Sequence, residues 1–406
     1  ERAGERNGYI EQPRISLSSD TSFDVAAGDV GNPVTNRCSD VDLSLFSKGM
    51  ECGSPLSAPC FNRSRCSLEN AENADIYVFD ADCSLSNSSA LLEATDGRKI
   101  ARTRMNRDHI AWELRLAANH AGGLAETYEM ACLFIHVSVG GDRPCAVDRP
   151  LWNDGSNHVM VDMSDDGRGS RPEIANSYAI EAASNMHTCF YRVGYDISVS
   201  LAPLRVFNSL ADIAPSDRKF FLTTKGTLYL TGHGSEERMS LVHLRNDRKG
   251  VVTSMKCFEN HGEHLLAENM QFCEALKAQY EVDDYDDLMN TTFGLVPAGR
   301  SPGTFRLGEV MSAGSIPVFI GRDLVLPFVE QLDWPSFSLS FTPDQVGTAM
   351  VQTLRSISQP ELESMQRKSL AASRYMFGTE ANDLGPSAKL LLDILRRRLR
   401  YRGGRT

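Results

Sequence analysis

Long apolar runs are missing from this chain of 406 residues, because no stretch approaches the roughly 18 to 20 consecutive apolar residues that a membrane helix needs. An excess of positive charge is missing too, since 42 basic residues face 53 acidic ones and the formal net charge is −11. Any bound anion must therefore be held by a local cluster of cations, and nucleic acid is a poor first guess. The length and the ordinary composition exclude a very small disulfide scaffold.

The opening 70 residues or so show no helical or strand period and are rich in Ser, Asn, Gly and Pro. Of the ten cysteines in the chain, four lie there: Cys38, Cys52, Cys60 and Cys66. Such a stem is either disordered or cross-linked, and cross-linking implies an oxidising compartment. Three sequons for N-glycans, at Asn62, Asn87 and Asn290, are compatible with that compartment. If the protein is secretory, we expect its targeting segment to lie upstream of Glu1 or to have been removed.

Two blocks of alternating strand and helix patterns follow the stem. The first has apolar runs at 75–80, 131–139 and 158–163, with a helix predicted to begin after Asn106. The second, after a Pro-bearing linker at 201–215, has strands predicted at 219–224, 292–296 and 316–320 and a helix at 304–313. This rhythm predicts two α/β layers with parallel sheets. The tail from Pro360 is helical in pattern and ends in LRRRLRYRGGRT, which is either a solvated helix end or a patch for a membrane or partner.

The segment at 297–314, PAGRSPGTFRLGEVMSAG, has the form of a phosphate-binding loop between a strand and a helix. Gly299 and Gly303 allow close approach of the backbone, and Thr304 is placed to cap the helix. Arg300 and Arg306 are predicted to hold a diphosphate through their guanidinium groups.

Glu309 follows Arg306 by three residues and so lies on the same helix face. A carboxylate there can accept both hydroxyls of a ribose. The alternative is an intrahelical ion pair between Arg306 and Glu309 at an ordinary helix start.

Read with its neighbours, this segment resembles the signature of the exostosin family of glycosyltransferases, a Pro-Arg-Gly loop that leads to Ser-Phe-Arg, then Glu, then Pro-Val. Further blocks are similar to that family in the same order along roughly 52–375: CFNRSRC before IYVFD, YEMACLFIHVS, LWNDGSNHVMVDM, KGTLYLTGHGS and DYDDLMNTTFGLVP. The chain departs from the signature at Ala298, where the family has Arg, which removes one cationic contact. Ser315 and Ser200 replace the family's Cys or Ala-Cys and its Pro, and we expect these two changes to affect packing.

The resemblance implies the GT-B fold class, an α/β architecture in which two Rossmann-like domains face each other across a cleft. It implies a Cys-bearing stem at 1–71, an N-terminal acceptor domain at 72–210, a C-terminal nucleotide-sugar domain at 211–345, and C-terminal helices with a basic tail at 346–406. The implied reaction is inverting transfer of a hexosyl, glucuronosyl or pentosyl group from a UDP-sugar to a glycan or glycoprotein. It uses no essential metal and no cofactor beyond the UDP-sugar co-substrate.

The implied location is the lumen of the Golgi or the endoplasmic reticulum, with a type II membrane anchor that this chain does not contain. Assembly with a copy of itself or with a related exostosin is implied as well. Two alternatives stay open: an exostosin-fold subunit without catalysis that supports a catalytic homologue, with Ala298 as its symptom, and a carbohydrate-binding protein without transfer.

Other residues are assigned roles within this hypothesis. Lys225, in the KG step after a strand, is a further cation for the leaving diphosphate, or else a solvated loop lysine. Asp154 and His158, in the WNDGSNH block, are the candidates for the base that deprotonates the acceptor, although His158 also suits a structural hydrogen bond. The acidic run DDYDD at 283–287 is interpreted as a solvated helix start rather than a metal site.

Two disulfides are predicted, Cys60 with Cys66 and Cys257 with Cys273. The first pair flanks a short loop, and the second follows from the resemblance. The competing hypothesis for the second pair is a zinc site that includes His261 and His264. Cys132, inside an apolar strand, is expected to be a buried free thiol.

Overall fold

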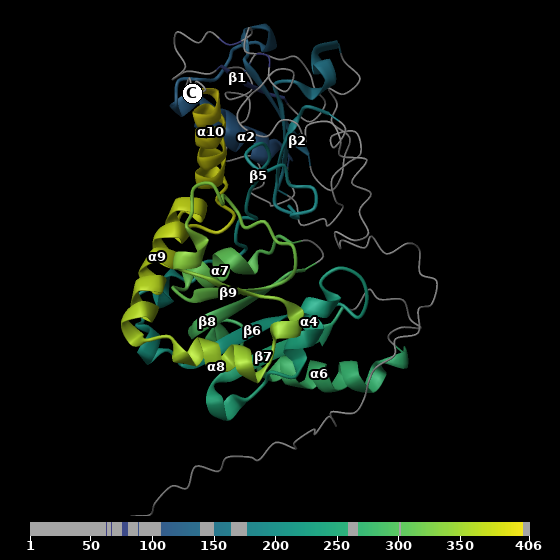
Figure 1. Ribbon diagram of the computed structural model, residues 1–406, viewed down its shortest axis with the longest axis vertical. Coiled ribbons are helices and arrows are strands. Elements are labelled where there is room, and N and C mark those ends of the chain that lie inside the picture. The colour runs from purple at the N-terminus through teal and green to yellow at the C-terminus, as the bar shows by residue number, and fades with distance from the viewer. Residues whose placement is uncertain are drawn as a thin grey trace, which may run out of the picture. The chain divides into compact units, whose positions relative to one another are not determined.

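The computed structural model divides the chain into two units, 1–33 and 34–406, and every residue that it describes lies in the second. The residues described are 62, 66, 75–79, 88, 107–138, 150–163, 177–258, 267–299 and 302–400. Figure 1 shows their helices and strands. In this part of the chain, no helix combines the length and the apolar character needed to cross a bilayer.

The N-terminal sheet contains five parallel strands in the order β1-β2-β3-β4-β5, so each strand pairs with the next along the chain. Its elements are β1 Ile76–Val78, α2 Arg107–His120, β2 Leu133–Ser138, β3 His158–Asp162, β4 Ile180–Ala183 and β5 Ile197–Ser198. Nearly every strand residue is buried. This burial on both faces is why the strands read as continuous apolar runs.

The C-terminal sheet is also parallel, with the order β10-β9-β8-β6-β7. Its strands are β6 Phe220–Leu228, β7 Val251–Cys257, β8 Thr291–Pro297, β9 Ile316–Ile320 and β10 Leu339–Phe341. The helices of this half are α4 Ser235–Val242, α6 Met270–Val282, α7 Arg306–Ser312, α8 Thr348–Ser356 and α9 Gln359–Phe377. Two parallel-sheet α/β halves confirm the predicted GT-B fold class, whereas the domain boundaries at 71, 210 and 345 stay a prediction.

The last helix, α10 Gly385–Arg400, returns to the N-terminal half and packs on α2, as Figure 1 shows. One hydrophobic core joins α2 and α10 to side chains from α7 and β9 of the C-terminal half. Arg398 of the basic tail is 8% exposed and pairs with Glu330. The carbonyl oxygens of Tyr195 and Asp196 also accept hydrogen bonds from Arg398. At this position the tail is therefore buried, and the interpretation as a solvated helix end is wrong for it.

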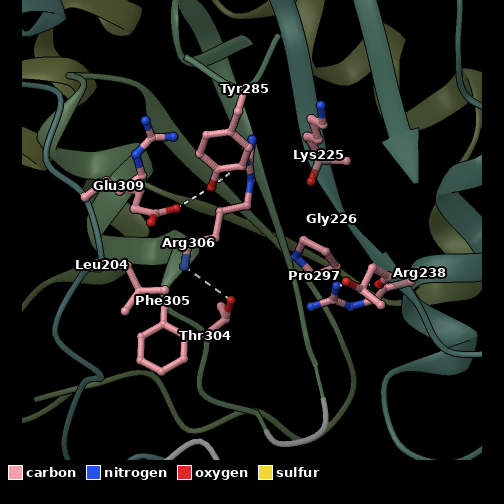
Figure 2. A pocket seen from close by; sticks show the side chains of 13 residues that line it. Leu204, Lys225, Gly226, Arg238, Tyr285, Pro297, Thr304, Phe305, Arg306 and Glu309 are labelled. Carbon is pink, nitrogen blue, oxygen red and sulfur yellow. Dashed lines mark hydrogen bonds between the residues drawn. The ribbon is translucent and has the colours of Figure 1, made fainter. Parts of the chain in front are cut away.

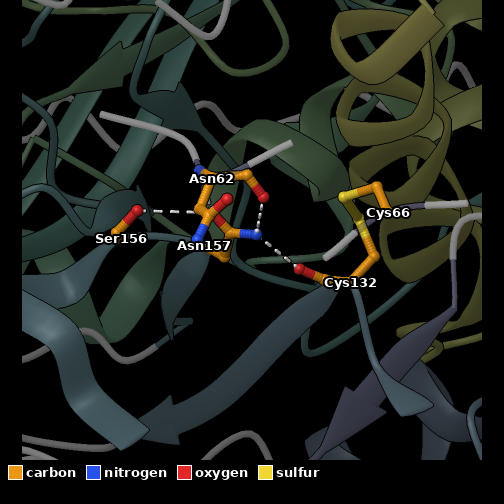
Figure 3. Close-up of a disulfide and its surroundings, with 5 residues drawn as sticks. All are labelled: Asn62, Cys66, Cys132, Ser156 and Asn157. Atoms are coloured by element: carbon orange, nitrogen blue, oxygen red, sulfur yellow. Dashed lines mark hydrogen bonds between the residues drawn. A yellow bond between two sulfur atoms is a disulfide. The ribbon is translucent and has the colours of Figure 1, made fainter. Parts of the chain in front are cut away.

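The disulfide at Cys66 differs from the prediction. Cys66 is joined to Cys132, which precedes β2, so the pairing of Cys66 with Cys60 is wrong, as is the free thiol expected at Cys132. Cys60 itself lies outside the described residues. The reason is local, because the side chain of Asn157 holds the backbone of Asn62 through two hydrogen bonds, 2.6 Å from its amide nitrogen and 3.0 Å from its carbonyl oxygen (Figure 3). A third bond, of 2.9 Å, runs from Asn157 to the carbonyl of Cys132 and brings the two cysteines together.

The second predicted disulfide, Cys257 with Cys273, is present and ties the end of β7 to α6. Because both thiols are used, they are not available for the zinc site considered above; His261 and His264 lie outside the described residues.

We expect peptide mapping of the protein under non-reducing conditions to recover the pairs Cys66–Cys132 and Cys257–Cys273. Recovery of a Cys60–Cys66 peptide would contradict the arrangement of the lead-in around Asn157. Free thiols at all four bonded positions would contradict an oxidising compartment.

Candidate functional site

A pocket of about 400 Å³ lies at the carboxyl ends of strands β6 and β8 in the C-terminal half. Its lining comes from β6, the last residue of β8, the start of α7, α4, the linker before β6, and the segment that follows α6. The residues are Leu204, Arg205, Thr224, Lys225, Gly226, Thr227, Arg238, Tyr285, Pro297, Thr304, Phe305, Arg306 and Glu309. This edge of a parallel sheet is where α/β proteins hold their ligands.

Three lining residues form one hydrogen-bonded group, seen on one side of the pocket in Figure 2. The Tyr285 hydroxyl donates to Oε2 of Glu309, and Nη1 of Arg306 lies 3.4 Å from the same hydroxyl. The Arg306 side chain is fixed further by hydrogen bonds from Nε to the carbonyl of Leu295, at 2.9 Å, and from Nη2 to that of Thr223, at 3.4 Å. Among the described residues no ion pair joins Arg306 to Glu309, so the intrahelical ion pair considered as the alternative is absent. The Tyr285 hydroxyl lies between the two side chains instead.

Burial raises the pKa of Glu309 above its ordinary value, although the hydrogen bond from Tyr285 and the charge of Arg306 oppose the shift. Burial also raises the pKa of Tyr285, with the charge of Arg306 acting against it. The hydroxyl of Tyr285 therefore stays protonated and remains a donor to the carboxylate of Glu309 at neutral pH. Glu309 is only 4% exposed and lines the pocket, so its carboxylate is shielded from bulk water while it borders the cavity.

Arg238 lines the opposite side of the pocket, next to Pro297 (Figure 2). Its Nε donates to the carbonyl of Ala298 at 3.0 Å, and its Nη1 donates to the carbonyl of Thr227 at 2.6 Å. Burial is the main cause that lowers the pKa of this guanidinium from its ordinary value, yet an arginine so placed remains charged at neutral pH. The sequence interpretation missed Arg238; its only signal was its position three residues after the KGTLYLTGHGS block.

Arg205 adds a half-exposed cation to the pocket lining and was also missed by the sequence interpretation. Its guanidinium lies 5.5 Å from the ring centres of Phe207 and Tyr285, and it forms an ion pair of 2.7 Å with Asp286. Among the described residues, the pocket lining thus contains four cations and one carboxylate, in a chain of net charge −11. Such a local excess of positive charge favours an anion at this place.

Lys225 lines the pocket from β6, but its ammonium group is engaged by the protein. It donates to the carbonyl oxygens of Tyr280, at 2.8 Å, and Asp283 at the carboxyl end of α6, and it lies 4.0 Å from the ring centre of Tyr280. Lys225 is thus neither a solvated loop lysine nor a fully free cation. Thr304 lines the pocket too, and its hydroxyl accepts a 3.3 Å hydrogen bond from the amide of Arg306. Arg300 lies outside the described residues.

Asp154 and His158, the predicted base candidates, are not among the residues that line this pocket. Asp154 is exposed in a turn with a φ of 57° before β3. His158 is fully buried, with Nε2 2.9 Å from the carbonyl oxygen of Leu151 and Nδ1 2.7 Å from Nε2 of His136. This is the geometry of the structural histidine that the sequence left as the alternative.

The proton positions in this pair follow from the carbonyl, which can only accept. Nε2 of His158 therefore donates to Leu151, its Nδ1 accepts, and His136 donates from Nε2. His136 stacks on Phe79 with ring centres 4.4 Å apart. Burial, helped by repulsion from His158, lowers the pKa of His136 well below its ordinary value.

We expect this histidine pair to make the folded state sensitive to acid. The folded pKa of His136 lies below the unfolded value of about 6.5, so the unfolded state takes up the proton first. The stability due to neutral His136 is complete above about pH 6.5 and is lost as the pH falls from there through the folded pKa. Urea unfolding at pH 7.5 and pH 5 measures the loss. In His136→Gln, whose amide donates without titrating, the loss should shrink, and an unchanged loss would contradict the assignment.

The match to a protein-family model covers residues 143–357, and the model describes the exostosin GT47 domain. Among curated proteins, the chain is 31% identical over 245 residues to exostosin-1 of Drosophila melanogaster, which covers 57% of this chain and 31% of that protein. It is 35% identical over 203 residues to exostosin-1c of Danio rerio, covering 46% of this chain and 26% of that protein. The chain therefore spans about a third of the length of these relatives or less.

Two solved structures resemble the chain at low sequence identity. A glycosyltransferase from Rickettsia africae is 10% identical, with a TM-score of 0.40, and the likeness covers 80% of this chain and 98% of that one. WaaG, a glycosyltransferase involved in lipopolysaccharide biosynthesis, is also 10% identical, with a TM-score of 0.33, covering 79% and 99%.

Proposed function

The chain belongs to the exostosin GT47 family, and from this premise we propose that it transfers a sugar from a UDP-sugar to a glycan or glycoprotein acceptor. The observation that carries the proposal is the pocket with four cations and one carboxylate at the carboxyl edge of the C-terminal sheet. This combination suits a nucleoside diphosphate. Guanidinium groups bind its phosphate oxygens, and a carboxylate accepts hydrogen bonds from its ribose hydroxyls.

The proposed reaction is a single inverting displacement. The acceptor hydroxyl oxygen forms a bond to the anomeric carbon of the sugar while the bond from that carbon to the diphosphate oxygen breaks. The bonding electrons leave with UDP, and the acceptor proton passes to a base. Arg238 and Arg306 stabilise the negative charge that develops on the diphosphate, so the mechanism uses no essential metal and no further cofactor. Asp154 remains the proposal for the base, because His158 has both ring nitrogens engaged.

In this proposal the nucleotide-sugar donor binds in the C-terminal half, and the acceptor binds on the N-terminal half. The disulfides Cys66–Cys132 and Cys257–Cys273 support a lumenal protein of the Golgi or endoplasmic reticulum. In the full-length protein we propose a type II anchor outside this chain, and assembly with a copy of itself or with a related exostosin. The transferred group is proposed to be a hexosyl, glucuronosyl or pentosyl group, and the donor screen identifies which.

The test is a panel of UDP-sugars offered to the purified protein, with hydrolysis, transfer to glycan acceptors and thermal stabilisation measured together. Binding of a donor at 100 times its Kd stabilises the folded state by about 2.7 kcal/mol. We expect one or a few donors to raise the melting temperature and to be hydrolysed. If UDP and every UDP-sugar leave the melting temperature unchanged and none is turned over, the transferase proposal fails.

The second candidate is a supporting subunit without catalysis, and the residue that favours it is Ala298. Its side chain is only 2% exposed and is not part of the pocket lining. A supporting subunit predicts stabilisation by a related exostosin with no turnover of its own. A carbohydrate-binding protein predicts stabilisation by glycans but not by UDP. The same panel, extended to these two additions, separates the three.

A further inference from the structure

Two histidines from different sheets touch beside the donor pocket. His187 follows β4 in the N-terminal half, and His233 lies in the loop between β6 and α4. Their Nε2 atoms are 3.3 Å apart, and the rings meet edge to face with centres 5.5 Å apart. His187 is 3% exposed, and His233 is half-buried. Neither residue belongs to the pocket lining, and no role follows for them from the proposed reaction.

The direction of the hydrogen bonds is fixed by a backbone group. Nδ1 of His233 lies 2.5 Å from the carbonyl oxygen of Gly299, which can only accept, so this nitrogen carries the proton. In neutral His233 the other nitrogen, Nε2, then accepts, and the proton in the contact belongs to His187. Burial, reinforced by the neighbouring His233 and opposed by Asp323, lowers the pKa of His187 to about 4. His187 is therefore neutral at pH 7, as this chain of bonds requires.

Gly299 links the two histidines to the pocket through the backbone. It stands two residues after Pro297, the pocket-lining end of β8. Gly234, with a φ of 79°, packs so closely that a Cβ atom there would lie 2.3 Å from the Gly299 oxygen. On the far side of the same loop, a Cβ at Gly303 would lie 2.3 Å from the carbonyl oxygen of Ser184, one residue after β4. At Gly299 and Gly303, residues 298–299 and 302–305 of this segment are thus in contact with both halves.

We propose that His187 and His233 form a brace that positions Gly299 and thereby sets the affinity of the pocket for its nucleotide donor. His233 is the positioning residue, because it bonds the loop directly, and His187 orients His233 from the N-terminal half. Without the brace, the end of β8 next to Pro297 and Arg238 has more freedom, and binding of the donor must then restrict it. The second part of the proposal rests on the proposed function, since it takes the pocket to be the donor site.

The test uses paired variants that remove or keep each hydrogen bond. His233→Leu removes both bonds, whereas the side-chain amide of His233→Asn sits where Nδ1 does and keeps the bond to Gly299. His187→Leu removes the donor to His233, whereas the amide of His187→Gln can replace it. Amide exchange at Ala298 and Gly299 in the unliganded protein reports the brace. UDP titration and the separate KM and kcat for the donor report its effect.

We expect the two Leu variants to exchange faster at Ala298 and Gly299 and to bind UDP about three- to tenfold more weakly, the range for one neutral hydrogen bond. The donor KM should rise with kcat nearly unchanged, and His233→Asn and His187→Gln should recover most of the loss. Melting temperatures and exchange in β2 serve as folding controls.

Unchanged exchange at Ala298 and Gly299 in both Leu variants would overturn the brace. Faster exchange with unchanged UDP affinity would overturn its link to the donor. If the wild-type protein binds no UDP at all, the proposed function fails, and the exchange result alone decides the brace.

Discussion

Arg238→Ala is expected to lower kcat on the preferred UDP-sugar by about 10²- to 10³-fold, the loss typical for one preorganised donor at a developing negative charge. Arg238 is chosen because one nitrogen of its guanidinium group, Nη2, is not used in a hydrogen bond by the described residues. Its Nε and Nη1 are bonded to the carbonyls of Ala298 and Thr227, which fixes the guanidinium plane. Within the described part of the chain, no hydrogen bond engages Nη2, and this group is available to a diphosphate oxygen.

The other cations of the pocket are engaged more fully by hydrogen bonds and ion pairs within the protein. Arg306 uses all three side-chain nitrogens within the protein, and Lys225 binds two carbonyl oxygens. Arg205 is half-exposed and paired with Asp286, so water and Asp286 already compensate its charge. Loss of Arg238 should therefore cost more turnover than loss of Arg205.

Two controls sharpen this test. Arg238→Lys keeps the charge but not the planar fork, and its kcat should lie between those of Arg238→Ala and the wild type. Arg248→Ala removes an exposed arginine outside the pocket and should leave kcat unchanged. Equal kcat in Arg238→Ala and the wild type, with folding intact, would take Arg238 out of the transition state.

The parts of the fold that the sequence predicted well are those in which the apolar pattern of a single segment is enough to identify the element. The apolar runs that form β2, β3, β8 and β9 can be recognised from the sequence alone, because parallel strands are buried on both faces. Strand β5 has two residues, Ile197–Ser198, and exists as a strand only through its pairing with β4. A pattern that short gives no period to detect.

The same limit applies to the site. Thr304, Arg306 and Glu309 lie close together in sequence and were predicted together, and all three line the pocket. Arg238 and Tyr285 reach the pocket from other elements, which only the packed sheet brings into contact. Tyr285 lies inside the acidic run at 283–287. Three of the four carboxylates in this run pair with cations, and the fourth, that of Asp284, accepts a hydrogen bond from the amide of Asp287. The ion pairs are Asp283 with Arg245, Asp286 with Arg205, and Asp287 with Lys219.

Glu309→Ala is expected to weaken UDP binding by about 1.5 to 3 kcal/mol, the range for hydrogen bonds to a charged group, which is roughly ten- to 150-fold in Kd. The reason is the place of the carboxylate, which is almost fully buried at the pocket wall. The Tyr285 hydroxyl donates to its Oε2, and the backbone of Arg205 also stabilises its charge. A carboxylate has about four lone-pair sites, so acceptor capacity remains for a ribose. Tyr285→Phe removes that hydroxyl and keeps the ring. It should weaken UDP binding less than Glu309→Ala does, since the carboxylate remains.

A ribose-specific comparison decides the role of Glu309. If its carboxylate accepts the ribose hydroxyls, wild-type protein should bind UDP more tightly than 2′-deoxy-UDP, and Glu309→Ala should lose most of that preference. Because the pKa of Glu309 is raised, its carboxylate takes up a proton and loses acceptor capacity as the pH falls through that pKa. The preference for UDP over 2′-deoxy-UDP should therefore decrease in acid for the wild type and should not change with pH for Glu309→Ala. Calorimetry that finds the same preference for UDP in Glu309→Ala as in the wild type would contradict the contact with both ribose hydroxyls, because a carboxylate that does not touch the 2′-hydroxyl cannot distinguish the two nucleotides.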